Sequence, residues 1–285
     1  MTQLMRNRVV FILVAVGAFV LAFGLGQVAG NKKDGAPKDG GGPTAPYTVK
    51  LVGDTDLPAA GSGKQELRFE VLDPAGTVVT DYDTVHEKKL HLIVAEKADP
   101  RIYAHLHPAF SDGVWSVATD LVGGEFRLYA DTRPTGADAQ VLTADFTVDG
   151  DRRATRAMAV NDTATVDGYD VALRADGTAY TFTVTKGGAP VTLQPYLGAG
   201  GHLVGIRTES LDYLHAHAMA AKANTVGFHV EAGSSGLWVL HLDFQVDGTV
   251  HDATFVQRID GAGMGGHDMD MGGMDMGDGE GHDHH

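Results

Sequence analysis

The chain contains two copies of the same set of short sequence segments, and this duplication restricts its fold more than any other feature. The first copy carries His-Leu-Ile-Val at 91–94 and Tyr-Ala-His-Leu-His at 103–107, and the second carries His-Leu-Val-Gly at 202–205 and Tyr-Leu-His-Ala-His at 213–217. Three further pairs match in the same order: 67–71 with 180–184, 124–131 with 236–243, and 144–148 with 253–256. Matching segments at one nearly constant spacing predict two repeats of a single structural unit.

Each copy reads as a series of short β-strands. Alternating polar and apolar residues are interrupted by Gly, Pro and Asp at the intervals typical of an all-β sandwich. Because side chains alternate along a strand, 236–244 should place Trp238, Leu240, Leu242 and Phe244 in the core and Val239, His241 and Asp243 on the opposite face. In the first copy, Phe126, Leu128 and Ala130 should point inward and Arg127, Tyr129 and Asp131 outward. We predict two tandem immunoglobulin-like or cupredoxin-like β-sandwiches, at 47–150 and 167–260, connected by 151–166.

The N-terminal segment predicts insertion into a membrane. Residues 9–26 carry no charged side chain, and as a helix they would extend about 27 Å, close to the roughly 30 Å of a bilayer core. Arg6 and Arg8 precede this run, which favours an N-terminus in the cytoplasm and the remainder outside. Residues 1–30 are therefore expected to be a single-pass anchor in the cell membrane, or a signal peptide cleaved near Gly30 that yields a secreted protein. Residues 31–46, rich in Gly and Pro, are expected to form a flexible tether.

The C-terminal segment has the composition of a metal-binding tail. Its 25 residues, 261–285, hold nine Gly, five Met, four His and six acidic residues, too few apolar groups to form a core. Thioethers suit Cu(I), and imidazoles suit Cu(II), Ni(II) or Zn(II). The candidate ligands are Met264, His267, Met269, Met271, Met274, Met276, His282, His284 and His285. The alternatives are a solubilising acidic tail and, for 282–285, part of an expression tag.

Composition removes several functional classes. The chain has no Cys, which excludes disulfides, thiolate nucleophiles, iron–sulfur clusters and blue-copper sites, and leaves 14 His and 9 Met as the softer metal ligands. A formal net charge of −15 argues against nucleic acid as a partner. None of the sequence signatures of a serine hydrolase elbow, a Walker loop, a dinucleotide fingerprint or a zinc-protease helix occurs.

The repeated His-x-His motif is the strongest chemical signal in the body of the chain. On an extended segment the two imidazoles lie on one face, with Cα atoms roughly 6.5–7 Å apart, so both rings can approach one ion. The candidate sets are His91 with His105 and His107 in the first copy, and His202 with His215 and His217 in the second. Further candidates are His86 in the first copy and His229, His241 and His251 in the second; we include His241 and His251 among the predicted ligands. The alternative is that these histidines are structural, hydrogen-bonded residues inherited by both copies.

The sequence also resembles a known group of proteins. The segments that carry the resemblance are 90–94 (LHLIV), 105–108 (HLHP), 112–115 (DGVW), 168–169 (GY), 194–204 (QPYLGAGGHLV) and 242–244 (LDF), within roughly 47–256. The chain is similar to uncharacterised secreted or membrane-anchored actinobacterial proteins that are loosely associated with heavy-metal, particularly copper, handling. In that group the second His-x-His motif is usually followed by proline; here Ala218 follows His217, so this loop differs. The resemblance implies an extracytoplasmic location and the fold more than any reaction.

Three functions are compatible with these features. The first is an extracytoplasmic, membrane-tethered protein that binds transition metal ions, with copper favoured and zinc or nickel as alternatives, for buffering or delivery. The second is a non-catalytic cell-surface interaction module whose histidines are structural. The third, ranked last, is a copper or zinc redox enzyme, because nothing in the sequence indicates an open coordination position.

Overall fold

The computed structural model describes residues 46–59, 61, 65–216 and 218–261, and every regular element in these ranges is a β-strand. The predicted membrane segment, most of the tether, the Met/His-rich tail and His217 lie outside the described residues. In the described part of the chain no helix has the length and apolar character needed to cross a membrane. The prediction of an all-β protein is confirmed.

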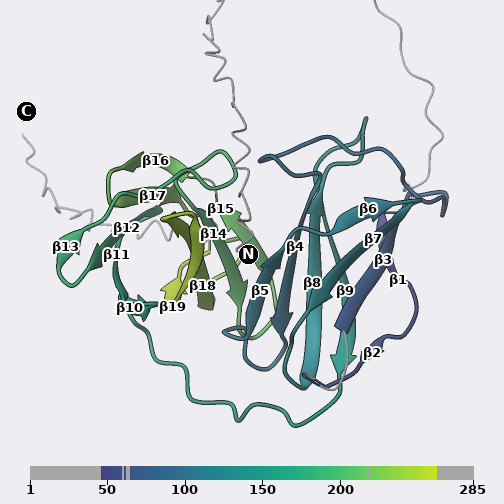
Figure 1. The fold of residues 1–285 in the computed structure, drawn as a ribbon, viewed down its shortest axis with the longest axis horizontal. Helices are drawn as coiled ribbons and strands as arrows, with labels where there is room; N and C mark the ends of the chain where they lie inside the picture. The colour runs from purple at the N-terminus through teal and green to yellow at the C-terminus, as the bar shows by residue number, and fades with distance from the viewer. Residues whose placement is uncertain (1–45, 60, 62–64, 217, 262–285) are drawn as a thin grey trace, which may run out of the picture. The chain divides into compact units, whose positions relative to one another are not determined.

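Copy one folds as two sheets packed face to face (Figure 1, purple to teal). The first sheet has the order β1-β3-β7-β6, formed by Thr48–Leu51 (β1), Gln65–Leu72 (β3), Val114–Thr119 (β7) and Ala109–Ser111 (β6). The second has the order β2-β9-β8-β4-β5, formed by Asp56–Leu57 (β2), Gln140–Val148 (β9), Gly124–Thr132 (β8), Leu90–Glu96 (β4) and Tyr103–Leu106 (β5). Neighbouring strands are antiparallel except β2 with β9.

Copy two repeats this arrangement (Figure 1, green to yellow). One sheet has the order β10-β11-β12-β17-β16, with β13 also paired to β12; its strands are Thr163–Val166 (β10), Tyr169–Asp176 (β11), Ala179–Lys186 (β12), Ala189–Pro190 (β13), Thr225–His229 (β17) and Ala218–Lys222 (β16). The other has the order β15-β14-β18-β19, formed by Tyr213–Ala216 (β15), His202–Arg207 (β14), Gly236–Val246 (β18) and Thr249–Ile259 (β19). The β10 strand falls within the segment 151–166 that the sequence predicts as a connection.

The strand orders of the two copies superimpose element by element. The order β1-β3-β7-β6 corresponds to β11-β12-β17-β16, and β9-β8-β4-β5 corresponds to β19-β18-β14-β15. Each copy also has its own apolar core between its two sheets, with Phe69, Trp115 and Phe126 in copy one and Phe182, Trp238 and Phe255 in copy two. The internal repeat predicted from the sequence is therefore a repeat of β-sandwiches.

The inward faces predicted from alternation are confirmed. Phe126, Leu128 and Ala130 lie in the core of copy one, and Trp238, Leu240, Leu242 and Phe244 lie in the core of copy two. The opposite faces of β8 and β18 are only partly exposed to solvent, since Tyr129, His241 and Asp243 are all buried. Burial on both faces means that these strands have a second packing partner.

That partner is the other copy. Both copies belong to one compact unit, and a third apolar cluster joins Ile93, Ala95 and Tyr129 of copy one to Val204 and Ile206 of copy two. Every residue of β4 is buried. Leu90, Leu92 and Val94 enter the core of copy one, Ile93 and Ala95 face copy two, and Glu96 accepts hydrogen bonds from the backbone of Ala98 and Asp99. The histidines lie on these mutually covered faces.

Candidate metal centre

Strand register brings the histidines of copy one together. In the antiparallel pair of β4 and β5, Ile93 lies opposite His105, and continuing that register places His91 opposite His107. Period-two alternation then puts all three imidazoles on the face that leaves the core of copy one. Pro108 follows His107 and restricts it to extended backbone angles, which agrees with its position just beyond the end of β5. The sequence prediction that these three residues share a face agrees with this arrangement.

The three rings converge closely enough to share an ion. One ligating nitrogen from each of His91, His105 and His107 can be chosen so that all three lie within 4.8 Å of one another. The ring centroids of His105 and His107 are 4.9 Å apart, and those of His91 and His107 are 5.2 Å apart. We call His91, His105 and His107 the first triad.

Hydrogen bonds leave two lone pairs of the first triad facing each other. His105 Nδ1 donates to a carboxylate oxygen of Asp243 at 2.6 Å, which leaves Nε2 as the nitrogen that can carry the lone pair of the ring. His91 Nε2 donates to the carbonyl oxygen of Val85 at 3.2 Å, which leaves its Nδ1 as an acceptor. These two acceptor nitrogens are 3.2 Å apart. Two nitrogens bound tetrahedrally to one ion at 2.0–2.1 Å would be about 3.3 Å apart, so the separation suits a shared transition metal ion.

A buried nitrogen of the first triad also has no partner within the described residues. His107 Nε2 is inaccessible to solvent and accepts or donates no hydrogen bond there. Leaving a buried polar atom unsatisfied costs about 1–3 kcal/mol, and a bound cation would remove that cost. The residues therefore fit a metal ion by both the spacing and the state of their nitrogens.

Two imidazoles of the first triad favour the neutral form. Burial, with a contribution from the nearby His105, lowers the pKa of His91 to about 4 and the pKa of His107 to about 3. Neutral rings offer lone pairs without first losing a proton, so protons do not compete with a metal ion near pH 7.

Each copy supplies a carboxylate that orients a histidine of the other copy. Asp243, on β18 of copy two, accepts from His105 of copy one, and Asp131, on β8 of copy one, accepts from His215 of copy two at 2.9 Å. Burial raises the pKa of Asp243, although His105 opposes this. Burial also acts to raise the pKa of Asp131, but the hydrogen bond and charge of His215 outweigh it and hold that pKa below its usual value. A carboxylate behind a metal-binding imidazole fixes the ring and increases its basicity.

Sequence reasoning did not assign Asp131 and Asp243 to the site. The available signal was their equivalent position in the two repeats, at the end of matching segments and on the face opposite the core. The sequence does not show that the other copy covers this face. Asp131 lies 84 residues along the chain from its partner His215, and Asp243 lies 138 residues from its partner His105.

Copy two holds a corresponding pair. In β14 and β15, Val204 lies opposite His215, which is the register found for Ile93 and His105. His202 Nδ1 and His215 Nε2 are 3.2 Å apart, and burial lowers the pKa of His202 to about 2, with His215 contributing. The rings of His91 and His202 stack at 5.7 Å between centroids, so the two pairs are neighbours across the interface. The predicted third ligand of this copy, His217, lies outside the described residues.

The predicted ligands His241 and His251 have other hydrogen-bond partners in the structure. His241 is fully buried, stacks on Tyr103 with 3.7 Å between centroids, and hydrogen-bonds Asp252 and the carbonyl oxygen of Pro100. Its Nδ1 thus bonds to its own copy and its Nε2 to copy one; Asp252 raises its pKa although burial opposes this. His251 hydrogen-bonds Asp167 at 2.7 Å and packs against aromatic rings of its own sandwich.

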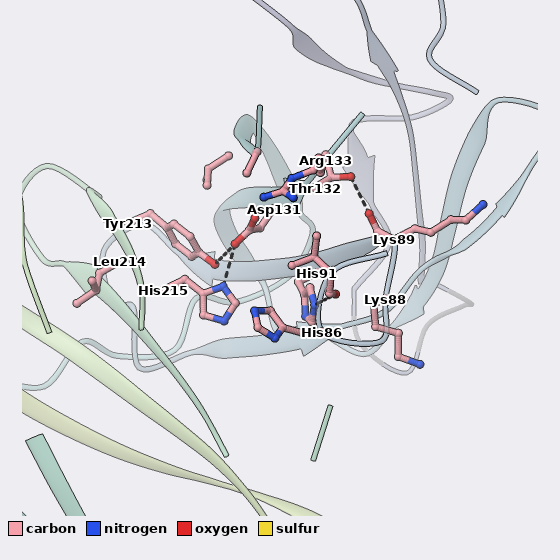
Figure 2. Close-up of a pocket in the computed structure, with 13 residues that line it drawn as sticks. His86, Lys88, Lys89, His91, Asp131, Thr132, Arg133, Tyr213, Leu214 and His215 are labelled. Atoms are coloured by element: carbon pink, nitrogen blue, oxygen red, sulfur yellow. Dashed lines mark hydrogen bonds and ion pairs between the residues drawn. The ribbon is translucent and has the colours of Figure 1, made fainter. Parts of the chain in front are cut away.

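A pocket reaches the histidines from solvent (Figure 2). Its volume is about 490 Å³, and its lining includes His86, His91, His215, Asp131 and the exposed Arg133. Figure 2 shows the His86 ring between those of His215 and His91, and Asp131 bonded to His215 and Tyr213. The pocket gives a hydrated ion a route to the buried nitrogens.

Solved structures similar to the chain are remote. A Salmonella alpha-2-macroglobulin reacted with methylamine is 15% identical, with 77% of this chain and 15% of that chain covered and a TM-score of 0.28. A tetra-tandem repeat from the extending region of a large adhesion protein is 14% identical, with 75% and 49% covered and a TM-score of 0.25. The BSP domain of a biofilm-associated protein is 12% identical, with 76% and 30% covered and a TM-score of 0.22. The chain thus spans less than half the length of each of these structures, and no curated protein matches it.

A family model, by contrast, matches most of the chain, and it does so twice. The two matched segments are residues 43–152 and 164–261, which correspond to the two sandwiches. The same model fitting both halves agrees with the duplication seen in the strand order. The chain therefore belongs to the family described as Domain of unknown function (DUF8832), of which it carries two copies.

Proposed function

We propose that this protein binds transition metal ions outside the cytoplasm, with copper as the favoured ion, and that it buffers or delivers them. The observation that carries the proposal is the first triad, in which three imidazoles, two of them with lowered pKa values, converge closely enough to share one ion in a buried interface. Two of its nitrogens, both left as acceptors by their other hydrogen bonds, face each other at 3.2 Å. A cation between them replaces a repulsion by two coordinate bonds.

The donor set narrows the choice of ion. Imidazole nitrogens without thiolates suit Cu(II), Zn(II) and Ni(II) better than Ca²⁺ or Mg²⁺, which prefer oxygen ligands. Among the divalent ions, Cu(II) binds nitrogen sites most tightly, and the methionines of the tail would add affinity for Cu(I). Zinc and nickel are the alternatives. Comparing the affinities of the protein for Cu(II), Zn(II) and Ni(II) decides among the three ions.

The location of the protein is part of the same proposal. The apolar run at 9–26 and the arginines before it favour a single-pass membrane anchor with the sandwiches outside the cytoplasm, or a secreted form if the chain is cleaved near Gly30. The tail would collect ions and the sandwiches would hold them, and the resemblance to the actinobacterial proteins agrees with the extracytoplasmic location. We also propose that the sandwiches are of immunoglobulin-like or cupredoxin-like type.

Calorimetric titration of the full chain in mild detergent tests the proposal. We expect Cu(II) or Zn(II) to bind more tightly than micromolar both to the full chain and to a variant lacking 261–285. In that shortened variant, His107→Ala should weaken binding, whereas replacing the exposed His229, which pairs with Glu231 at 2.9 Å, should not. Absence of binding tighter than micromolar in both forms would overturn the proposal.

An interaction module with structural histidines is the second candidate. The bonds of His105 to Asp243 and of His215 to Asp131 favour it, because they join the two copies without any metal. In that case, replacing these histidines would lower the unfolding free energy equally with and without metal ions. If the protein binds metal, a metal-ion concentration 100 times Kd should stabilise the wild type but not these variants, by about 2.7 kcal/mol.

A redox enzyme is the third candidate. It is supported only by the pocket beside the histidines, and it would require turnover by the metal-loaded protein.

A further inference from the structure

The histidine pair of copy two has the same arrangement as the pair that anchors the first triad. His202 Nδ1 lies 3.2 Å from His215 Nε2, as His91 Nδ1 does from His105 Nε2. His215 Nδ1 donates to Asp131, which leaves its Nε2 as an acceptor directed at His202. Two imidazoles and a supporting carboxylate are therefore in place on this side of the interface as well.

The turn before β4 carries a third imidazole to this pair from copy one. His86 has a positive φ of 50° in the turn closed by Val85 and Lys88. The equivalent turn of copy two, closed by Tyr196 and Ala199, has Leu197 at the same place with a φ of 53°. The two copies thus share a backbone shape and differ in side chain, and only copy one offers a metal ligand.

The ring of His86 lies nearer to that of His202 of copy two than to that of His91 of its own copy. Its centroid is 5.5 Å from that of His202 and 6.2 Å from that of His215, compared with 6.1 Å from that of His91. These spacings are up to about an ångström longer than those within the first triad. A side-chain rotation in a half-exposed turn can close such a difference, because rotamer changes there are fast and inexpensive.

The other ring nitrogen of His202 is unsatisfied. His202 is 3% exposed, and its Nε2 is buried with no hydrogen-bond partner among the described residues. Its counterpart in copy one, His91 Nε2, donates to the carbonyl oxygen of Val85. Within the described residues, no second hydrogen bond fixes the tautomer of His202, so its neutral imidazole can present a lone pair at Nδ1, beside His215, or at Nε2.

The pocket beside these rings supplies access. His86 and His215 both line it, and Figure 2 shows the two rings next to each other. A hydrated ion that enters the pocket meets His86 and His215 without passing through either apolar core.

We propose that the interface holds a second transition metal ion, bound by His86 of copy one together with His202 and His215 of copy two. The inference rests on the proposed function and extends it from one ion to a two-ion centre. Each ion would then have a ligand or a supporting carboxylate from both copies, so that metal loading links the two sandwiches. The chemical class of the ligand is a divalent ion that prefers nitrogen donors, such as Cu(II) or Zn(II).

The test compares the number of Cu(II) ions retained per full chain by the wild type and by matched variants after dialysis. His86→Leu places in copy one the residue that copy two already tolerates at this φ, so this variant is expected to fold. His229→Leu is the control, since it removes an exposed histidine distant from the cluster. Ions bound by the tail are the same in every variant and cancel in the differences.

We expect His86→Leu to retain one ion fewer than the wild type, His107→Ala to lose one other ion, and His229→Leu to lose none. Electron paramagnetic resonance gives an independent measurement, because two nearby Cu(II) ions couple magnetically, and His86→Leu should abolish that coupling. If His86→Leu keeps the wild-type ion count and coupling while His107→Ala loses an ion, the second site is refuted and the proposed function stands. If neither variant changes the ion count, the metal-binding function of the sandwiches fails as well.

Discussion

Replacing Asp243 with asparagine should weaken the binding of the first ion without removing any ligand. Asp243 accepts a 2.6 Å hydrogen bond from Nδ1 of His105, and the two side chains are 5% and 4% exposed. When a metal binds Nε2 of His105, the ring becomes more positive and the N–H a stronger donor, so an anionic acceptor gains more than a neutral one. Asparagine keeps the size and one acceptor oxygen but removes the charge.

The expected effect follows from the burial of this pair. Loss of a carboxylate behind a metal-binding histidine typically reduces metal affinity 10- to 100-fold, which corresponds to about 1.4–2.8 kcal/mol. A hydrogen bond to a charged group is worth about 1.5–3 kcal/mol, which covers the same range. Because water is almost excluded from the contact, solvent screening should not reduce the effect to the few tenths of a kcal/mol found at exposed pairs.

Competition against a chromophoric zinc chelator measures this affinity over the needed range. Asp145→Asn serves as the matched control, because Asp145 is 40% exposed and pairs with Lys97 and Arg127, away from the histidines. Urea unfolding of both variants without metal separates an effect on binding from an effect on folding. A Zn(II) affinity for Asp243→Asn within twofold of the wild-type value, with the fold intact, would show that the carboxylate does not support a metal ligand.

Three further outcomes are expected. Burial, helped by the nearby His105, lowers the pKa of His91 to about 4, below its unfolded value of about 6.5, so the unfolded state binds more protons between these values. As pH falls from 6.5 to 4, His91 alone should cost the metal-free protein about 3 kcal/mol, and His107 and His202, whose pKa values are also lowered, should add to this loss; equal urea stability at pH 7 and pH 5 would contradict this. Ile206→Ala in the apolar cluster between the copies should cost about 2–5 kcal/mol in urea unfolding, whereas a loss below 0.5 kcal/mol would mean that the copies do not pack there in solution. Deleting 261–285 should lower the total number of ions bound but leave the tenfold or greater effect of Asp243→Asn unchanged, and disappearance of that effect would place the binding in the tail.

The comparison of sequence with structure separates local from long-range information. Alternation along 236–244 and 124–131 is enough to identify the core face, because side chains of an extended strand alternate regardless of what lies beyond them. For the same reason, the His-x-His spacing predicted that His105 and His107 share a face. The duplication, read from matching segments, predicted the repeated sandwich.

Alternation cannot reveal whether the opposite face is exposed or covered. The sequence predicted Tyr129 and Asp131 as outward-facing, and they do leave the core of copy one, but the other copy covers them. Likewise, His241 is a residue type that commonly binds metal ions, but in the structure its ring stacks on Tyr103 and hydrogen-bonds the carbonyl oxygen of Pro100, both in copy one. Such contacts depend on how two finished surfaces fit, which no periodicity within one segment encodes.

The sequence alone thus determined the strands, the repeat and the histidines that share a face in each copy, since these follow from local geometry and short-range register. Only the tertiary structure decided that the two histidine pairs adjoin, that Asp131 and Asp243 each support a ring of the opposite copy, and that His86 lies beside His202. Those pairings join residues more than 80 positions apart, and they exist because burying the apolar faces of β4 and β14 against each other brings the polar groups of both sheets into one interface.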